Sequence, residues 1–283
     1  MTSLTVVIPA HNEQNIIQSA LRPLLDAPEG EIQIVVVANG CSDATAERAR
    51  ETATGIRVID IAAASKIAAL NAGSREAADY PVAFVDADVD VSGSDLVALA
   101  QRLEAGPAHV ASPTMRVLPS SSWWVRQYYR VWALTDYRSS GHIGSGVYML
   151  SAEGRARFDD FPPVIADDLY VQRLFAADER LTPDDLFFSV RAPATLRALL
   201  GRNARIAAGN RQLAQLYPEL TPPSARAGAS SLVKRVWRRP DLWIGFAVYT
   251  AVYTLARRRA RALLAASGQI AWTRDETTRR AVA

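Results

Sequence analysis

Short apolar runs alternate with alanine-rich, helix-favouring segments over the first 115 residues of the chain. The runs are rich in valine and isoleucine, and most of them end at a polar or glycine-containing loop. Nearly continuous apolar strands separated by helices are typical of a parallel sheet that is covered on both faces. The pattern therefore predicts an α/β fold with a mainly parallel central sheet, with strands at residues 4–8, 32–37, 58–61, 82–85 and 109–112.

The pattern changes after this region. Residues 120–137 carry tryptophan and tyrosine at helical spacing and predict an aromatic amphipathic helix. A glycine-rich loop at 141–146 precedes a predicted strand at 147–150, and residues 195–216 predict a long helix with several arginines. The predicted organisation is a main domain at 1–217 with halves at 1–115 and 116–217, a Pro/Ser/Ala/Gly linker at 218–231, and a basic amphipathic helical tail at 232–283.

The composition is that of a globular protein, with 49% hydrophobic and 22% charged residues. Cys41 is the only cysteine of the chain, which excludes an intramolecular disulfide and a multi-cysteine metal site. A metal would therefore be held by oxygen or histidine ligands. The N-terminus lacks the pattern of a signal peptide, so we expect a cytoplasmic protein.

Charge is distributed unevenly along the chain. Residues 1–120 contain 8 basic and 15 acidic side chains, whereas residues 234–283 contain 11 basic and 3 acidic ones. An acidic half suits a divalent cation, and a basic tail suits an anionic partner. The uncharged run at 242–256 would span about 22 Å as a helix, which is short of a bilayer core. This run predicts either an interfacial helix on anionic lipid, at the inner face of the membrane, or a helix packed on the domain or on a dimer partner.

Three polar loops follow predicted strands, at residues 9–13, 39–43 and 86–90. Ligands of parallel sheets bind at the carboxyl ends of the strands, so these loops are expected to converge. One residue separates Asp86 from Asp88, which would direct both carboxylates to the same side of an extended backbone. Such a pair can hold Mg²⁺ or Mn²⁺ and leave room for phosphate oxygens. The alternative is an acidic loop that caps the helix beginning near residues 92–95.

Five segments carry recognisable motifs, in chain order TVVIPAHNE, VVVANGCSDAT, KIAALNAG, VDADV and GSGVYMLSAEGRARFDDFPPVIADDLYVQRL. Together they resemble the motifs of the family 2 glycosyltransferases, which have the GT-A fold and transfer sugars from nucleotide sugars with inversion. The resemblance covers roughly residues 4–213. It implies a Rossmann-like sheet with a C-terminal helical extension, a nucleotide-sugar donor, a divalent cation (Mg²⁺ or Mn²⁺), and a sugar, lipid-linked or small-molecule acceptor.

The resemblance also implies roles for individual residues. Asp88 would bind the metal, with Asp86 nearer the ribose or beside the metal's own ligands. Asp168 would be the general base, and Asp167 stands where the family usually has glutamate. Each role has a non-catalytic alternative: Asp167 and Asp168 would cap a helix, the arginines would be solvated, and the aromatics would pack in the core. His142 would either complete a metal site or have no function. Donor-binding positions are Pro9, His11, Glu13, Asn39, Asp43, Lys66, Asp86, Arg202 and Arg205, and acceptor-binding positions are Trp124, Tyr128, Gly144, Ser145 and Gly146.

The nucleotide loop departs from the family pattern. Ala38 and Asn39 replace the usual pair of aspartates. A carboxylate at the first position would accept a hydrogen bond from a uracil imide, whereas alanine cannot. The base of the donor is therefore left open between guanosine, thymidine and a base that is recognised by the backbone. Two other functions compete: a catalytically silent scaffold, which the altered loop favours, and a sugar nucleotidyltransferase, which needs a glycine-rich phosphate loop that PAHNE does not provide. We do not expect nucleic-acid binding, because the predicted nucleotide pocket is acidic.

Overall fold

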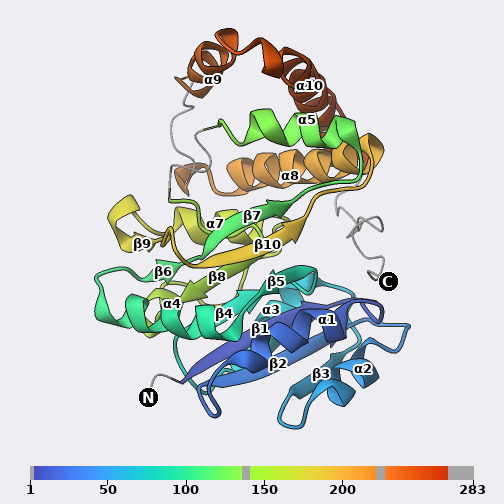
Figure 1. The fold of residues 1–283 in the computed structure, drawn as a ribbon. Coiled ribbons are helices and arrows are strands. Elements are labelled where there is room, and N and C mark those ends of the chain that lie inside the picture. Colours follow the sequence, from blue (N-terminus) through green and yellow to red (C-terminus); the bar gives the residue numbers. More distant parts are fainter. Residues whose placement is uncertain (1–2, 136–140, 221–226, 267–283) are drawn as a thin grey trace.

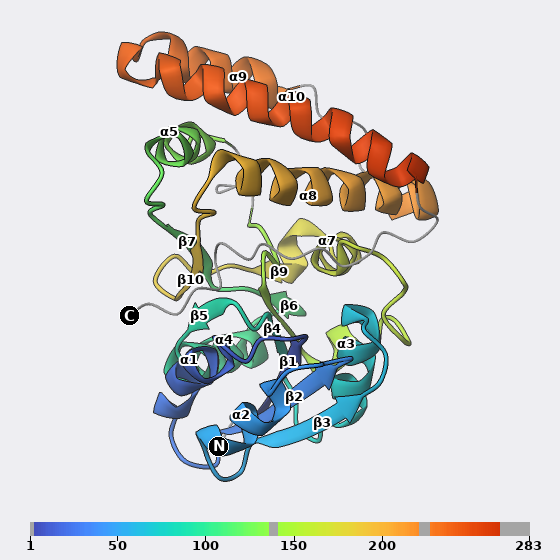
Figure 2. The ribbon, with the colours of Figure 1, turned by 90° about the vertical axis from the view of Figure 1, so that its right-hand side faces the viewer.

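The computed structural model describes residues 3–135, 141–220 and 227–266. A layer of long helices lies on one end of an α/β body (Figure 1). A view turned by 90° shows the same layer at the end of the molecule opposite β2 (Ile32–Asn39) and β3 (Arg57–Ile61) (Figure 2). The predicted α/β class with a C-terminal helical region is confirmed.

The central sheet has seven strands in the order β3-β2-β1-β4-β8-β6-β9. β1 pairs in parallel with β2 and β4, and β8 runs antiparallel to β4 and β6. The sheet is thus mainly parallel, and each strand predicted from the apolar runs is present. The strands are β1 (Leu4–Ala10), β2 (Ile32–Asn39), β3 (Arg57–Ile61), β4 (Val82–Val85), β6 (Val110–Ala111), β8 (Val147–Leu150) and β9 (Arg180–Leu181).

Both faces of the sheet are buried, which explains why its inner strands are apolar at consecutive positions. Leu4, Val6 and Ile8 of β1 share a core with helices α1 and α4, whereas Val7 joins the core on the opposite face. On that face Gly73 of α3 lies directly against Val7. The helices are α1 (Ile17–Leu21), α2 (Thr45–Thr52), α3 (Lys66–Arg75), α4 (Gly93–Ala105), α6 (Ala152–Arg155) and α7 (Asp167–Arg173), with 3-10 turns η1 (Arg22–Asp26), η3 (Ala177–Glu179), η4 (Pro218–Leu220) and η5 (Pro240–Leu242).

A second sheet, which the apolar pattern did not predict, joins the two halves of the main domain. Its strand order is β5-β10-β7, with β10 antiparallel to β5 and parallel to β7. The predicted boundary at residue 115 falls within β7. The strands are β5 (Val89–Val91), β7 (Thr114–Leu118) and β10 (Phe187–Arg191).

The helical layer consists of α5 (Trp123–Trp132), α8 (Leu196–Leu216), α9 (Ala227–Trp237) and α10 (Trp243–Ala266). α10 packs against α8 and α5, and its Tyr249 stacks on Tyr128 with the ring centroids 5.2 Å apart. One face of the run at 242–256 is therefore packed on the domain, and its other face is exposed. α9 begins inside the segment predicted as a linker. Among the described residues, no helix is both long and apolar enough for a membrane crossing.

Candidate active site

The loops that follow β1 and β2 are tied together by hydrogen bonds. His11 Nδ1 lies 2.5 Å from the backbone oxygen of Asn39, and the backbone N–H of Ser42 donates to Asn12 Oδ1 over 2.7 Å. Asn12 adopts a positive φ of 51°, a conformation that asparagine tolerates better than most residues. These bonds hold the predicted donor-binding positions of the two loops side by side, with Pro9 buried in the last part of β1.

The same loops use Asp43 and Glu13 to start helix α2. Glu13 is buried, and its backbone N–H donates to Thr45 Oγ1 over 2.7 Å. Asp43 Oδ1 accepts from the backbone N–H of Thr45 over 3.1 Å, and its other oxygen accepts from the N–H of Gln14. The structure therefore gives the carboxylate of Asp43 a local role in shaping the loop.

Asn39 is fully buried at the end of β2, and neither its Oδ1 nor its Nδ2 has a hydrogen-bond partner among the described residues. A buried amide without partners costs about 1–3 kcal/mol. Ala38, the preceding residue, is also buried. The loop that departs from the family pattern thus retains one polar side chain whose hydrogen-bonding capacity is unused within the described chain.

Lys66, the first residue of α3, connects two carboxylates from distant parts of the chain. Its Nζ lies 2.8 Å from Asp86 Oδ1 and 3.1 Å from Asp167 Oδ1. The side chain of Asp167 is only 3% exposed, and its second oxygen accepts from the hydroxyl of Tyr148 over 3.3 Å. Tyr148 was not among the predicted site residues. Its place on β8 directly after the glycine-rich loop is the signal that could have indicated it.

Burial and charge act against each other in this cluster. Burial raises the pKa of Asp167 to about 6 although the Lys66 charge opposes the shift. Burial likewise raises the pKa of Asp86, and the nearby negative charge of Asp88 adds to this effect. For Lys66, burial acts to lower the pKa, but the carboxylates of Asp167 and Asp86 outweigh it and the net pKa is raised. The ammonium group thus stays charged and holds the two carboxylates together.

The glycine-rich loop lies between the two acidic motifs. Ser145 donates its backbone N–H to Asp168 Oδ2 over 2.9 Å, while Gly146 accepts through its carbonyl from the N–H of Asp86 over 2.8 Å. A Cβ on Gly144 would lie 2.5 Å from the Cβ of Asp168. Gly144 and Gly146 also have positive φ angles of 107° and 110°, which favour glycine. Tight contact and backbone conformation together explain the two glycines.

The predicted extended backbone between Asp86 and Asp88 is wrong. β4 ends at Val85, and the N–H of Val89 donates to the carbonyl of Asp86, which closes a turn. The predicted cap of α4 is present, but Ser92 provides it by accepting from the N–H of Asp95. Neither Asp86 nor Asp88 is therefore needed to cap α4.

The donor set of this turn fits a hard divalent cation. Asp88 is exposed, and its charge is close enough to Asp86 to raise the pKa of that residue. Two neighbouring carboxylates repel each other, and a cation that accepts oxygen ligands relieves the repulsion. No group of three or more histidine, cysteine or acidic side chains is arranged as a metal site within the described residues. Any ion here would take most of its ligands from water and from a bound diphosphate.

Sequence comparison identifies the family of this chain. The model of the family described as "Glycosyl transferase family 2" matches residues 5–158, more than half of the chain. The chain belongs to glycosyl transferase family 2. It is accordingly a glycosyltransferase. Among curated proteins, no sequence matches it significantly.

Solved structures of glycosyltransferases share the fold. A mannosyltransferase from Pyrobaculum calidifontis, in complex with GDP-Man and Mn²⁺, is 20% identical with a TM-score of 0.61, covering 93% of this chain and 78% of the other. Glucosyl-3-phosphoglycerate synthase from Mycobacterium tuberculosis, in complex with Mg²⁺ and UDP, is 20% identical with a TM-score of 0.56 over 79% and 81%. TarS from S. aureus, in complex with UDP, is 15% identical with a TM-score of 0.52 over 92% of each chain.

Of the other candidate residues of this glycosyltransferase, His142 lies beside the glycine-rich loop, whereas the two arginines lie on α8. His142 Nε2 lies 3.1 Å from Ser145 Oγ, and burial lowers the pKa of His142 to about 4 although Asp168 opposes the shift. Arg202 and Arg205 are half-buried on α8, and the guanidinium of Arg202 donates to the hydroxyl of Tyr129 over 3.2 Å. The structure therefore places both arginines on the helical layer.

The two predicted acceptor aromatics have different environments. Tyr128 of α5 is buried against α8 and α10. It stacks on Tyr249, and its hydroxyl accepts from Asn203 Nδ2 over 3.2 Å. Packing within the glycosyltransferase's helical layer thus accounts for Tyr128 without an acceptor. Trp124 is half exposed at the start of α5 and contacts Trp123 edge to face.

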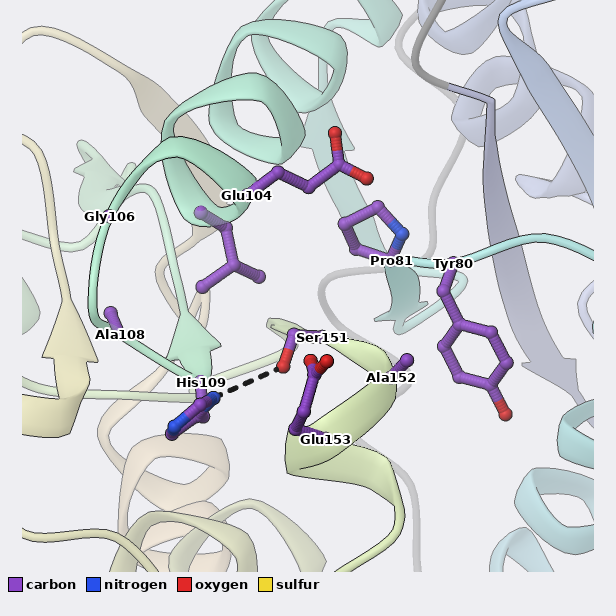
Figure 3. A pocket seen from close by; sticks show the side chains of 10 residues that line it. Tyr80, Pro81, Glu104, Gly106, Ala108, His109, Ser151, Ala152 and Glu153 are labelled. Atoms are coloured by element: carbon purple, nitrogen blue, oxygen red, sulfur yellow. Dashed lines mark hydrogen bonds between the residues drawn. The ribbon is translucent and has the colours of Figure 1, made fainter.

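A separate cavity of about 480 Å³ lies at the opposite end of the strands, where β4 and β6 begin and β8 ends (Figure 3). His109 and Ser151 face each other there over 3.4 Å, but Ser151 also accepts from the N–H of Gly154 and caps α6. None of the predicted site residues of the glycosyltransferase lines it. The lining residues are Tyr80, Pro81, Leu103, Glu104, Gly106, Ala108, His109, Ser151, Ala152 and Glu153.

Proposed function

We propose that the chain transfers a sugar from a nucleotide-sugar donor to an acceptor hydroxyl, with inversion at the anomeric carbon and with Asp168 as the general base. The observation that carries the proposal is the glycine-rich loop at residues 144–146, which contacts Asp86 through one residue and Asp168 through another. This places a candidate metal ligand and a candidate base on either side of one short loop, near the carboxyl ends of β1 and β4.

Asp168 is better suited to act as the base than Asp167. Asp167 is buried and already engaged by Lys66 and Tyr148. Asp168 is half-buried, and its oxygens accept backbone N–H groups from Ser145 and Leu169, which orient the carboxylate. An oriented, accessible carboxylate can accept a proton from an acceptor hydroxyl. We therefore assign Asp168 to the proton transfer and Asp167 to holding Lys66 in place.

The transfer would be a single displacement. The acceptor oxygen forms a bond to C1 of the sugar, its proton passes to Asp168, and the bond from C1 to the diphosphate breaks, with the electron pair leaving on the diphosphate. Attack opposite the leaving group inverts the anomeric carbon. Asp88, with Asp86 beside it, would hold the divalent cation, which when bound offsets the charge on the departing diphosphate. The backbone N–H of Ser145 would keep Asp168 in position beside the reacting atoms, and the ammonium group of Lys66 would do the same for Asp86.

The donor is proposed to be a nucleoside diphosphate sugar. Of the similar solved structures, one holds GDP-Man with Mn²⁺, one holds UDP with Mg²⁺ and one holds UDP, which supports this class without choosing the base. Asn39 is the side chain that we propose contacts the base or the ribose, because its amide is buried without a partner in the described chain at the end of β2. The acceptor is proposed to be a sugar, a lipid-linked sugar or a small-molecule hydroxyl.

Nucleotide binding with and without metal tests this function. Isothermal titration with GDP, UDP and TDP, each with and without Mn²⁺, should show one preferred base and tighter binding with the metal. The variant Asp88→Ala should lose the gain that Mn²⁺ provides. Asp90→Ala is the matched control, because Asp90 is an exposed aspartate two residues further on, in β5, and should keep the gain.

Donor hydrolysis then separates an enzyme from a silent scaffold. Wild-type protein should release the nucleoside diphosphate slowly from the preferred nucleotide sugar, and chelation should stop this release. Nucleotide binding without any hydrolysis or transfer, across the whole donor panel, would favour the scaffold. Full activity after prolonged chelation, together with an active Asp88→Ala enzyme, would end the metal-dependent proposal.

A further inference from the structure

Four exposed apolar side chains gather where α9 ends and α10 begins. Trp237 and Trp243 are 72% and 53% exposed, and their ring centroids are 6.3 Å apart. Val233 and Ile244, at 46% and 56% exposure, lie one helical turn before Trp237 and next to Trp243. We call these four residues the tryptophan corner. Two exposed tryptophans in contact are uncommon on a protein surface, which makes the corner a candidate interaction site.

The corner is held on a packed base. Leu232 and Val236 on the inner side of α9 form a buried cluster with Leu242 and with Val131 of α5. The backbone N–H of Leu242 donates to the carbonyl of Arg239, which closes the turn between the two helices. The buried side chains hold the corner in place, so the exposed ones are not needed for packing.

An uncharged stripe continues from the corner along the outer face of α10. Ile244, Ala247, Ala251 and Leu255 follow one another at intervals of three and four residues and are all exposed. The opposite side of α10 faces α5 and α8 through buried residues such as Val252. The outer stripe ends at a run of exposed arginines that begins at Arg257.

Basic residues surround the corner and the far end of the stripe. Between residues 227 and 266 the chain has eight lysines and arginines and a single acidic residue, Asp241. That carboxylate is paired with Arg130 over 2.7 Å and with Arg239 over 3.2 Å. The exposed side chains of Lys234 and Arg238 lie on the same short segment as Trp237. The surface therefore combines apolar side chains with net positive charge.

We propose that the tryptophan corner and the outer stripe of α10 dock onto an anionic lipid bilayer. Tryptophan suits the interface of a bilayer, the aliphatic side chains suit its acyl boundary, and cations around them suit anionic headgroups. A second copy of this chain fits less well, because a symmetric contact would bring the two sets of cations together. The proposal is independent of the donor and of the base assigned above.

This docking would leave the donor loops free. In both views α9 and α10 form the end of the molecule opposite β2 and β3 (Figures 1 and 2). α8 and α5 lie between α10 and the α/β body, so the tryptophan corner and the aspartates around Lys66 belong to different surfaces. A lipid-bound enzyme of this kind would still take up a water-soluble nucleotide sugar.

Vesicle flotation of the full-length chain tests the proposal, with pure phosphatidylcholine compared with phosphatidylcholine containing phosphatidylglycerol. Wild-type protein should float with the anionic vesicles at low salt and less at high salt. Changing Lys234 and Arg238 to glutamine should reduce partitioning by about 30-fold, because each cation contributes about five-fold near an anionic surface. The matched control changes Arg22 and Arg50, two exposed arginines of the opposite end, to glutamine and should partition as wild type.

A second pair of variants separates the apolar contribution. Trp237→Ser with Trp243→Ser should lower binding to anionic vesicles by about ten-fold or more, whereas Leu25→Ser with Leu118→Ser, two exposed leucines elsewhere, should not. Circular dichroism should show equal thermal midpoints for all of them, because the changed side chains are exposed.

Three results would overturn the proposal. The first is failure of the wild-type chain to float with either vesicle. The second is equal loss of binding in the corner variants and their matched controls. The third is light scattering that shows a dimer dissociated by the corner variants when no vesicle binding occurs, which would assign the corner to a second copy.

Discussion

Replacing Lys66 by methionine should strongly destabilise this glycosyltransferase at neutral pH. Methionine keeps an unbranched side chain, shorter by one heavy atom, and removes its charge. Asp167, with 3% of its side chain exposed, would then keep the 3.3 Å hydrogen bond from the hydroxyl of Tyr148 as its one side-chain partner among the described residues. Removing one partner of a buried ion pair costs about 3–5 kcal/mol, because the other charge is left unpaired. Asp86 contributes less to this cost, because water reaches about a third of its side chain.

The loss of stability caused by Lys66→Met should become smaller as the pH falls. Burial raises the pKa of Asp167 to about 6 even with Lys66 present, and removing the lysine raises it further. In the unfolded chain the pKa is about 3.9, so the folded state binds the proton more tightly. Stability linked to this group therefore increases as the pH falls through the folded pKa and reaches its full value below the unfolded one. Between pH 8 and pH 5 the free energy of unfolding of the variant should increase more than that of the wild type, by about 1.4 kcal/mol for each unit of additional pKa shift of Asp167.

Urea unfolding of the metal-free protein, followed by circular dichroism at pH 5, 7 and 8, measures both effects. The double variant Lys66→Met with Asp167→Asn is the control, because it removes the charge from both partners. It should recover most of the lost stability and yield a coupling free energy of about 2 kcal/mol or more in a double-mutant cycle. A Lys66→Met penalty below about 1 kcal/mol at pH 7, or one that is equal at pH 5 and pH 8, would refute this reasoning.

Three further predictions concern the base and two glycines, and a third glycine serves as a control. Asp168→Asn should keep nucleotide binding in titration calorimetry but reduce transfer by about 10²–10⁴-fold, and near-wild-type transfer would move the base elsewhere. Gly144→Ala should lower turnover and destabilise the fold by about 1–3 kcal/mol, because its Cβ would lie 2.5 Å from that of Asp168 at a φ of 107°; unchanged kinetics and melting would contradict this. Gly73→Ala should destabilise by about 1–3 kcal/mol in urea, since its Cβ would lie 2.2 Å from Val7 Cγ1. Gly201→Ala on α8, where nothing lies within 4 Å, should instead be neutral or stabilising by up to about 1 kcal/mol.

The sequence alone was sufficient for six of the seven strands of the main sheet, all except β9, and for the loops that follow β1, β2 and β4. The strands β1, β2 and β4 are apolar at consecutive positions because both faces of the sheet are covered, and this local property is visible in the letters. Parallel pairing then places the ends of β1, β2 and β4 at one edge. The ordered motifs of the family lie at these ends, so fold and family could be predicted together.

The pattern of apolar positions did not predict the second sheet. Phe187–Arg191 pairs with Thr114–Leu118, a segment more than seventy residues earlier, and with Val89–Val91. β7 and β10 are partly exposed and mix polar with apolar residues, so no continuous apolar run marks them in the sequence. Only tertiary packing decides that such segments form strands.

Tertiary structure also decided the difference between two adjacent aspartates. Asp167 and Asp168 are equivalent as sequence letters, yet the first is buried against Lys66 and the second accepts from the loop at Ser145. Neighbouring residues at the start of a helix point in different directions, and their partners come from α3 and from the loop before β8. In the same way, the sequence determined that residues 242–256 form an apolar helix, but packing against α5 and α8 decided which face of that helix is buried and which is exposed.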